Sequence, residues 1–199
     1  ASNKKQIITR EKAYHGSTYL SASVTGKERD KTAMDVKREG IHFLKAPCHF
    51  YYPEFDNEDD FCDFLINELE EKIIEIGPEN IMAFIAEPIL ASGGVIVPPK
   101  NYNYRCWEVV KRYNIIYIAD EVVTAFGRLG YWFASEHVFG IIPDIIIFAK
   151  GITSGYIPMG GYAVSEKFMS TFSGDEADGC LYSNAVSYTH LTLPTTSWV

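Results

Sequence analysis

The chain has 199 residues, 47% of them hydrophobic and 22% charged, with a net charge of −8. This composition is typical of a globular domain that can enclose a core, and it excludes collagen-like and disordered chains. The chain is acidic and has no Lys/Arg cluster, so no nucleic-acid partner is predicted. It has no apolar run long enough to span a bilayer, so no membrane segment is predicted.

The predicted elements begin with a short strand at residues 5–9. Residues 26–39 are highly charged, which predicts an exposed loop or a short helix. Residues 57–76 carry apolar side chains at helical spacing, and acidic residues crowd the first turn, where the helix dipole favours them. Gly77 and Pro78 then end this predicted helix.

A threefold pattern follows along the chain. Short apolar runs at residues 81–86, 115–119 and 145–149 are followed at once by Glu87, Asp120 and Lys150, respectively. Continuous apolar runs of this length are typical of strands buried on both faces of a parallel sheet. Apolar residues between positions 102 and 113 predict a crossover helix after the first run. Helical signal before the third run is limited to about residues 135–139.

The three charged residues are 33 and 30 positions apart, close to the length of a β-α-β unit. An open parallel sheet binds its ligand outside the carboxyl ends of its strands, so Glu87, Asp120 and Lys150 are predicted to converge on one site. For any one of them, the alternative is that a charged residue follows the strand only because the chain reaches the solvent-exposed surface there. The three together favour a site.

The lysine and the aspartate suggest a specific chemistry. Desolvation at the end of a buried strand lowers the pKa of a lysine, and a neutral amine can form a Schiff base. A carboxylate nearby can bind a protonated pyridine nitrogen. Pyridoxal phosphate needs both groups, a lysine for its aldehyde and a carboxylate for its ring nitrogen. Lys150 and Asp120 therefore indicate a pyridoxal phosphate site.

Five motifs, in this order, resemble those of class III aminotransferases. They are YHG at 14–16, EP at 87–88 with GGV at 93–95, ADEVVTAFGR at 119–128, PD at 143–144 with KG at 150–151, and SGYIPMGG at 154–161. The resemblance covers about residues 5–175. It implies the α/β fold of fold type I pyridoxal-phosphate enzymes, in which a mostly parallel sheet with flanking helices forms an incomplete large domain.

The resemblance also implies roles for five residues. Lys150 is expected to carry the cofactor as a Schiff base and to move the proton, and Asp120 to bind the pyridine nitrogen. Tyr14 is expected to stack on one face of the cofactor ring and Val122 to pack on the other. Glu87 is expected near the cofactor, although a structural ion pair is almost as good an interpretation.

Neighbouring positions add detail. We assign no proton-transfer role to His15, and we expect Arg128 to fix the geometry of its loop. Many class III members have glutamine where this chain has Val123. The Val-Val pair is similar to the branch that transfers amino groups from ω-amino acids and amines to pyruvate.

Two other interpretations stay open at this point. A decarboxylase or an aminomutase of the same fold would use the same cofactor for a different reaction. A nucleotide-binding ATPase module would use Asp120 and Glu121 on a metal ion, although the chain has no GxxxxGK[ST] loop. The cysteines at positions 48, 62, 106 and 180 form no CxxC pair, so no metal site is predicted for the transaminase. Dispersed cysteines of this kind suit a reducing environment, which predicts a cytoplasmic protein.

The predicted boundaries place a partial cofactor-binding domain at residues 1–185 and a non-native, adapter-like tail at residues 186–199. The resemblance implies that a phosphate-binding loop precedes residue 1, and that a threonine reaching a partner subunit's phosphate follows about Asn184. The chain as given is therefore expected to bind the cofactor weakly and to have little activity. The family resemblance implies a homodimer, with the loop at 151–161 against the partner subunit.

Overall fold

The computed structural model describes residues 4–31, 36–37 and 39–167. The elements below belong to one compact unit, which spans Ala1–Val164. The predicted tail at residues 186–199 and Cys180 lie outside the described residues.

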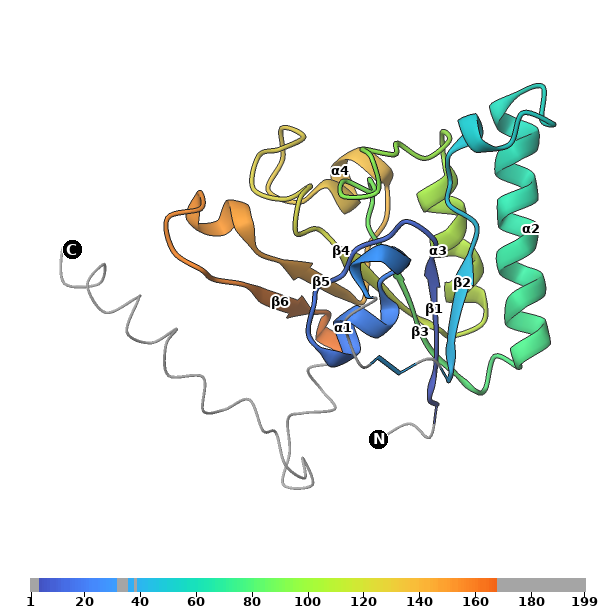
Figure 1. The fold of residues 1–199 in the computed structure, drawn as a ribbon, viewed down its shortest axis with the longest axis horizontal. Helices are drawn as coiled ribbons and strands as arrows, with labels where there is room; N and C mark the ends of the chain where they lie inside the picture. The colour runs from blue at the N-terminus through green and yellow to red at the C-terminus, as the bar shows by residue number, and fades with distance from the viewer. Residues whose placement is uncertain (1–3, 32–35, 38, 168–199) are drawn as a thin grey trace. The chain divides into compact units, whose positions relative to one another are not determined.

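A single six-stranded sheet organises this unit (Figure 1). The spatial order of the strands is β2-β1-β3-β4-β5-β6, and every neighbouring pair is parallel except β5 and β6. The strands are β1 (Gln6–Arg10), β2 (Ile41–Leu44), β3 (Ile81–Ala86), β4 (Ile116–Asp120), β5 (Ile145–Phe148) and β6 (Gly161–Val164). The prediction of a mostly parallel sheet is thus confirmed, including the adjacent positions of the three apolar runs.

Four α-helices and three short 3-10 helices connect the strands. They are α1 (Tyr19–Val24), η1 (Glu28–Asp30), η2 (His49–Tyr51), α2 (Glu58–Ile76), α3 (Tyr102–Arg112), α4 (Ala134–Phe139) and η3 (Lys150–Thr153). The side chain of Asn57 caps α2 by accepting from Asp60 N at 2.9 Å, and Gly77, with φ 84°, ends the helix. The predicted helices at 57–76, 102–113 and 135–139 are all confirmed within one or two residues.

The main core lies between the sheet and the pair of helices α2 and α3. Phe61, Leu65 and Leu69 of α2 are buried there with residues of α3. Ile8, Phe84 and Tyr117 form the sheet side of the same cluster, and the rings of Phe84 and Tyr117 meet at 5.6 Å. In Figure 1 both helices lie together beside the strands β1 to β4. This packing holds the carboxyl ends of the central strands in a fixed arrangement.

Two expectations from the sequence need correction. Strand β5 is half-buried along its whole length rather than buried on both faces, because the elements in extensive contact with it are its neighbours β4 and β6. The charged segment at 26–39 is not uniformly exposed either. Lys31 is 3% exposed, since its ammonium binds Glu28 Oε1 at 2.7 Å and lies over the ring of Phe43.

The described helices include none that is both long and apolar enough to cross a bilayer. The described cysteines are free thiols, with Cys62 and Cys106 buried and Cys48 half-buried.

Candidate active site

The carboxyl ends of β1, β3, β4 and β5 lie at the same edge of the sheet, because these strands are parallel neighbours. Glu87 directly follows β3, Asp120 is the last residue of β4, and Lys150 comes two residues after β5. Tyr14 lies in the segment that follows β1. The structure therefore brings these predicted residues to one edge, which is where a doubly wound sheet places its ligand.

Asp120 is 5% exposed, and both of its carboxylate oxygens have partners. Oδ1 accepts from the backbone N–H of Val122 at 3.1 Å, and Oδ2 lies 2.6 Å from His15 Nδ1. The other ring nitrogen of His15 lies 3.4 Å from Thr9 Oγ1, which donates to the carbonyl of Val24. Asp120 is thus held from two sides, with the imidazole next to one oxygen.

The contact between His15 and Asp120 is not indicated by the sequence. His15 is adjacent to Tyr14 in sequence, and 105 residues separate it from Asp120. No local pattern predicts the contact, since it depends on the order in which β1, β3 and β4 pair. Both the imidazole and the carboxylate are almost fully buried, at 1% and 5% exposure of their side chains.

Glu87 links two segments of the site. Its carboxylate accepts from Tyr14 N at 2.9 Å and from Ala91 N at 3.1 Å, and its backbone carbonyl accepts from the Arg10 guanidinium. Burial raises the pKa of Glu87, and the charge of Asp120 adds to this, while the Tyr14 N–H, His15 and Arg10 act in the opposite direction. Glu87 therefore positions the Tyr14 segment and the following loop.

The raised pKa of Glu87 predicts a pH-dependent stability. When the folded-state pKa of an acid lies above the unfolded value, its contribution to stability is complete below the unfolded pKa and is lost as pH rises through the folded pKa. We expect the free energy of unfolding of the wild type to rise, relative to Glu87→Gln, as pH falls toward the ordinary value of 4.5. Urea unfolding of both proteins across this window tests it. A constant difference, or one that shrinks on acidification, would contradict the prediction.

The expectation that Lys150 is desolvated is wrong for this structure, because the residue is exposed to solvent. Its backbone has φ 44°, in the left-handed region that non-glycine residues rarely adopt. Such conformations gather at functional sites, where the surrounding structure holds them. Because β5 is only half-buried, its end does not enclose the lysine that follows it.

Lys150 lines a cleft of about 620 Å³ together with Val122, Phe126 and Gly127. Val122 lies between Asp120 and the cleft of Lys150. Its N–H donates to Asp120 Oδ1, and the residue itself lines the cleft. Val123 and Arg128 also border this cleft. Tyr14 is half-buried, and its hydroxyl lies 2.8 Å from Ser17 Oγ.

Glu121 is a second residue whose role the sequence did not indicate. It is fully buried, and its carboxylate accepts from Ala134 N (2.7 Å), Ser135 N (2.9 Å), Ser135 Oγ (2.5 Å) and Thr124 Oγ1 (3.0 Å). Four donors saturate the acceptor positions of a carboxylate. Glu121 therefore caps the start of α4 and closes the loop that carries Val122, and it is unavailable to a metal ion. In the described residues, no group of three or more His, Cys, Asp or Glu side chains is arranged to hold one.

Replacing Glu121 with glutamine is expected to destabilise the protein by about 1–3 kcal/mol, because the amide turns a donor toward backbone N–H groups that then lose their acceptor. Urea unfolding measures this change. Thr124→Ala is the matched control, since it removes a single hydroxyl donor and leaves the carboxylate in place. Equal effects of the two substitutions would show that Glu121 does not organise the loop.

Comparison with known proteins decides the family. The family model described as "Aminotransferase class-III" matches residues 1–189. The chain belongs to the class III aminotransferases. Members of this family use pyridoxal phosphate. The predicted family and fold are thereby confirmed.

Curated relatives include "Gamma-aminobutyrate transaminase 1, mitochondrial" of Oryza sativa subsp. indica, 42% identical over 189 residues, which are 91% of this chain and 36% of that protein. The "Putrescine--pyruvate aminotransferase" of Pseudomonas aeruginosa is 42% identical over 184 residues, 90% of this chain and 40% of that protein. The chain thus spans well under half the length of these relatives.

Solved structures of transaminases share the fold. An (S)-enantioselective omega-transaminase from Thermomicrobium roseum superimposes with a TM-score of 0.80 at 41% identity, covering 85% of this chain and 38% of the other. The omega-transaminase from Pseudomonas jessenii, solved in complex with PMP, gives a TM-score of 0.80 at 39% identity and covers 84% of this chain and 37% of that one.

Proposed function

We propose that this class III aminotransferase chain is part of a larger enzyme that moves an amino group from an ω-amino acid or amine to a keto acid, with pyruvate as the acceptor. The observation that carries the proposal is the buried Asp120 carboxylate, which His15 and Val122 hold beside the cleft of Lys150. The names of the relatives, which include a γ-aminobutyrate transaminase and a putrescine–pyruvate aminotransferase, support this substrate class.

The described residues fit pyridoxal phosphate. A buried carboxylate suits a protonated pyridine nitrogen, an aromatic side chain and a valine are present for the two ring faces, and a lysine amine stands in the adjoining cleft. When bound, the cofactor supplies an aldehyde for the amine donor and a ring that withdraws electrons from the reacting carbon. We propose Lys150, Asp120, Tyr14, Val122 and Glu87 as its binding residues.

Asp120 would hold a proton on the pyridine nitrogen through a charge-assisted hydrogen bond. Val122 N–H and the His15 ring fix the direction of its two oxygens, so that little rearrangement is needed when the ring arrives. His15 would act as a positioning residue here through its contact with Asp120, and the absence of a proton-transfer role stays a prediction.

Lys150 would hold the cofactor through its Nζ. When this amine is free, it would move the proton between the amine-bearing carbon of the donor and the cofactor. Tyr14 and Val122 would pack on the two ring faces. Glu87 would keep Tyr14 in place through its hydrogen bond to the Tyr14 N–H.

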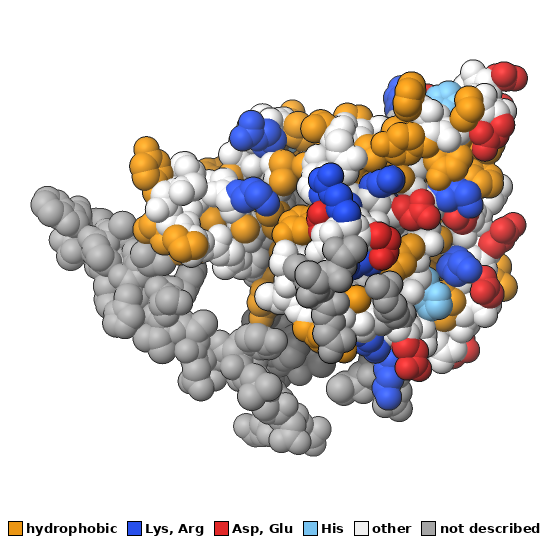
Figure 2. Space-filling view, viewed as in Figure 1, with side chains coloured by type: hydrophobic (Ala, Val, Ile, Leu, Met, Phe, Trp, Pro, Cys, Tyr) orange, Lys and Arg blue, Asp and Glu red, His pale blue; other side chains and the backbone are white. Residues whose placement is uncertain are grey.

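The proposal extends to assembly and location. Large hydrophobic side chains are exposed near β6 and the loop before it, with Tyr156 at 90% and Tyr162 at 52%. Figure 2 shows hydrophobic side chains at this end of the molecule. An aromatic surface of this kind suits a partner subunit, so we propose a homodimer in the complete enzyme. We propose a cytoplasmic location from the free thiols, although the rice relative is named as mitochondrial.

Half-reaction chemistry on the full-length protein that carries this chain tests the function. With cofactor and amine donor but no keto acid, we expect stoichiometric conversion of the cofactor to pyridoxamine phosphate, reversed by pyruvate. Borohydride reduction followed by peptide mapping should place the label on Lys150. Release of CO₂ without pyridoxamine phosphate would indicate a decarboxylase instead, and an isomerised amino compound would indicate an aminomutase.

A further inference from the structure

Arg10 is a fully buried cation that the proposed reaction does not use. It is the last residue of β1 and is 0% exposed. Its Nη2 has a hydrogen-bond partner, but its Nε and Nη1 have none among the described residues. A guanidinium stays charged inside a protein, and a buried charge with unfilled donors costs stability. Because apolar side chains can often replace buried charges without loss of stability, the fold alone does not account for this arginine.

The partner of Arg10 is the backbone of Glu87. Nη2 donates to the carbonyl of Glu87, which directly follows β3, the parallel neighbour of β1. The guanidinium also lies over the ring of Tyr102 in α3, 5.8 Å from the ring centroid. The side chain of Arg10 thus ties the carboxyl end of β3 to β1 and to α3.

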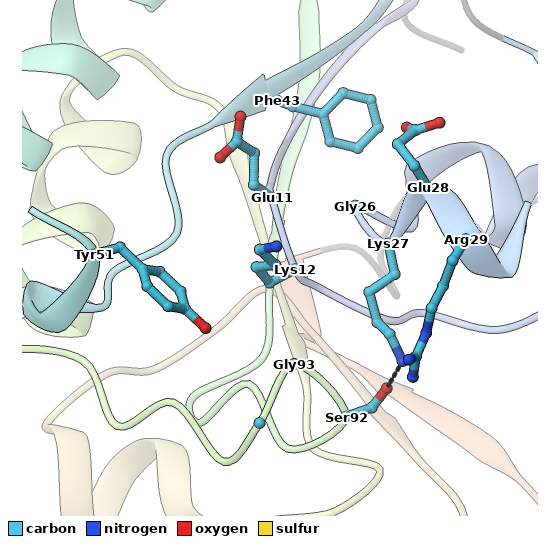
Figure 3. Close-up of a pocket in the computed structure, with 11 residues that line it drawn as sticks. Glu11, Lys12, Gly26, Lys27, Glu28, Arg29, Phe43, Tyr51, Ser92 and Gly93 are labelled. Atoms are coloured by element: carbon cyan, nitrogen blue, oxygen red, sulfur yellow. Dashed lines mark hydrogen bonds between the residues drawn. The ribbon is translucent and has the colours of Figure 1, made fainter.

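The segment from Arg10 to Tyr14 is packed closely by glycines on two sides. A Cβ atom at Gly26 would clash with the carbonyl oxygen of Arg10, and one at Gly93 would lie 2.7 Å from the carbonyl oxygen of Lys12. Glycine is what allows backbones to approach this closely. Figure 3 shows Lys12 between Gly26 and Gly93. Close-packed segments transmit a displacement rather than absorb it, so a movement at Arg10 should reach Tyr14.

Glu87 carries the link from Arg10 to two parts of the candidate site. Its Oε1 accepts from Tyr14 N at 2.9 Å, and its Oε2 accepts from Ala91 N at 3.1 Å. Ala91 lines the cleft of Lys150. Both oxygens are thus acceptors, which is the arrangement of an ionised carboxylate. One side chain therefore holds the segment of the stacking tyrosine and the loop that borders the cleft.

The charge of Arg10 supports the ionised state of Glu87. Burial raises the pKa of the Glu87 carboxyl and the charge of Asp120 adds to this, whereas the Tyr14 N–H, His15 and Arg10 lower it. Arg10 thus acts on Glu87 in two ways, through its charge on the carboxylate and through its hydrogen bond to the carbonyl.

We infer that Arg10 is a positioning residue that acts through Glu87 to place Tyr14 against the cofactor ring. The inference rests on the proposed function and adds a residue outside the cofactor's own contacts. The same carboxylate holds Ala91, so the loop that borders the cleft depends on Arg10 as well. Arg10 is buried and does not line the cleft of Lys150, so its effect on the cofactor has to pass through its neighbours.

Titration of the full-length enzyme, freed of its cofactor, with pyridoxal phosphate tests the inference. Arg10→Met should raise the Kd of the cofactor roughly tenfold, the effect of one lost charge-assisted hydrogen bond. The circular dichroism band of the bound cofactor should shrink, because the ring is no longer held at one angle against Tyr14. Arg10→Lys keeps the charge and can donate to the same carbonyl, so its Kd should lie between those of the wild type and Arg10→Met.

Two further variants separate positioning from a general loss of stability. If the effect passes through Glu87, adding Arg10→Met to Glu87→Gln should change the Kd by clearly less than Arg10→Met does alone. Leu69→Ala is the control for stability, because Leu69 is buried in the main core and does not line the cleft. It should lower the urea midpoint of unfolding and leave the Kd and the circular dichroism band of the cofactor unchanged.

An unchanged Kd and band in Arg10→Met, or an equal factor in Kd with and without Glu87→Gln, would overturn the inference. The same holds if Leu69→Ala weakens cofactor binding as much as Arg10→Met at a similar loss of stability. If Arg10→Met does not fold, Arg10→Lys is compared in the same two backgrounds, and a wild-type Kd for it overturns the inference. A wild-type enzyme that binds no pyridoxal phosphate would count against the proposed function instead.

Discussion

Replacing Lys150 with alanine is expected to lower kcat of the full-length enzyme by roughly 10²- to 10⁴-fold, the usual contribution of a positioned acid–base group. The substitution removes both the covalent attachment of the cofactor and the amine that moves the proton. Stopped-flow absorbance of the donor half-reaction measures the loss directly. Lys150→Arg should be equally impaired, because arginine keeps the charge but supplies no neutral amine.

Lys111→Ala provides the control for a lysine that lies outside the site. Lys111 belongs to α3 and its ammonium lies 4.4 Å from the centroid of the Trp107 ring. Its removal should leave kcat unchanged. A Lys150→Ala enzyme that retains half or more of the wild-type kcat would remove the basis for the assignment of this residue. Partial rescue by added small amines would support it.

The second large effect is expected at Asp120. Asp120→Asn keeps an oxygen that can accept from Val122 N–H but removes the negative charge next to the ring nitrogen. We expect kcat to fall roughly 10²- to 10³-fold, a typical cost of removing one preorganised electrostatic group. The absorbance spectrum of the bound cofactor should change with it, because the ring nitrogen loses its proton. Cofactor binding itself should weaken less than kcat.

Asp144→Asn is the matched control for this substitution. Asp144 Oδ2 accepts from Tyr117 N at 2.9 Å, so it too is a carboxylate bound to a strand backbone, but it lies before β5, at the opposite end from Lys150. The change should reduce stability and leave kcat unchanged. If both aspartate variants reduced kcat alike, the effect of Asp120 would reflect folding rather than chemistry.

The sequence predicted the central elements well because their signals are local. The apolar run at 81–86 becomes β3. The helix predicted from Asn57, with its acidic first turn, to the residue before Gly77 agrees with α2 within one residue. Apolar periodicity and capping act over one or two turns, so they can be recognised without knowledge of the rest of the chain. The prediction was weaker at β5, where an apolar run of the same kind is only half-buried.

The contacts around the candidate site could not be predicted in this way. His15 meets Asp120, Glu87 holds Tyr14 and Ala91, and Lys27 reaches Ser92. Most of these pairs join residues more than sixty positions apart. Their meeting depends on which strands become neighbours and on how closely glycine loops approach them.

Taken by itself, the sequence determined the parallel strands, the charged residues at their ends, and the pairing of a lysine with an aspartate that indicates pyridoxal phosphate. These follow from residue type and short-range spacing. Only the tertiary structure decided that an imidazole lies against Asp120, and that Glu121 is a buried cap whose carboxylate binds the start of α4. The reason is physical: hydrogen bonds between distant segments form only where packing of the sheet and its loops brings donor and acceptor together.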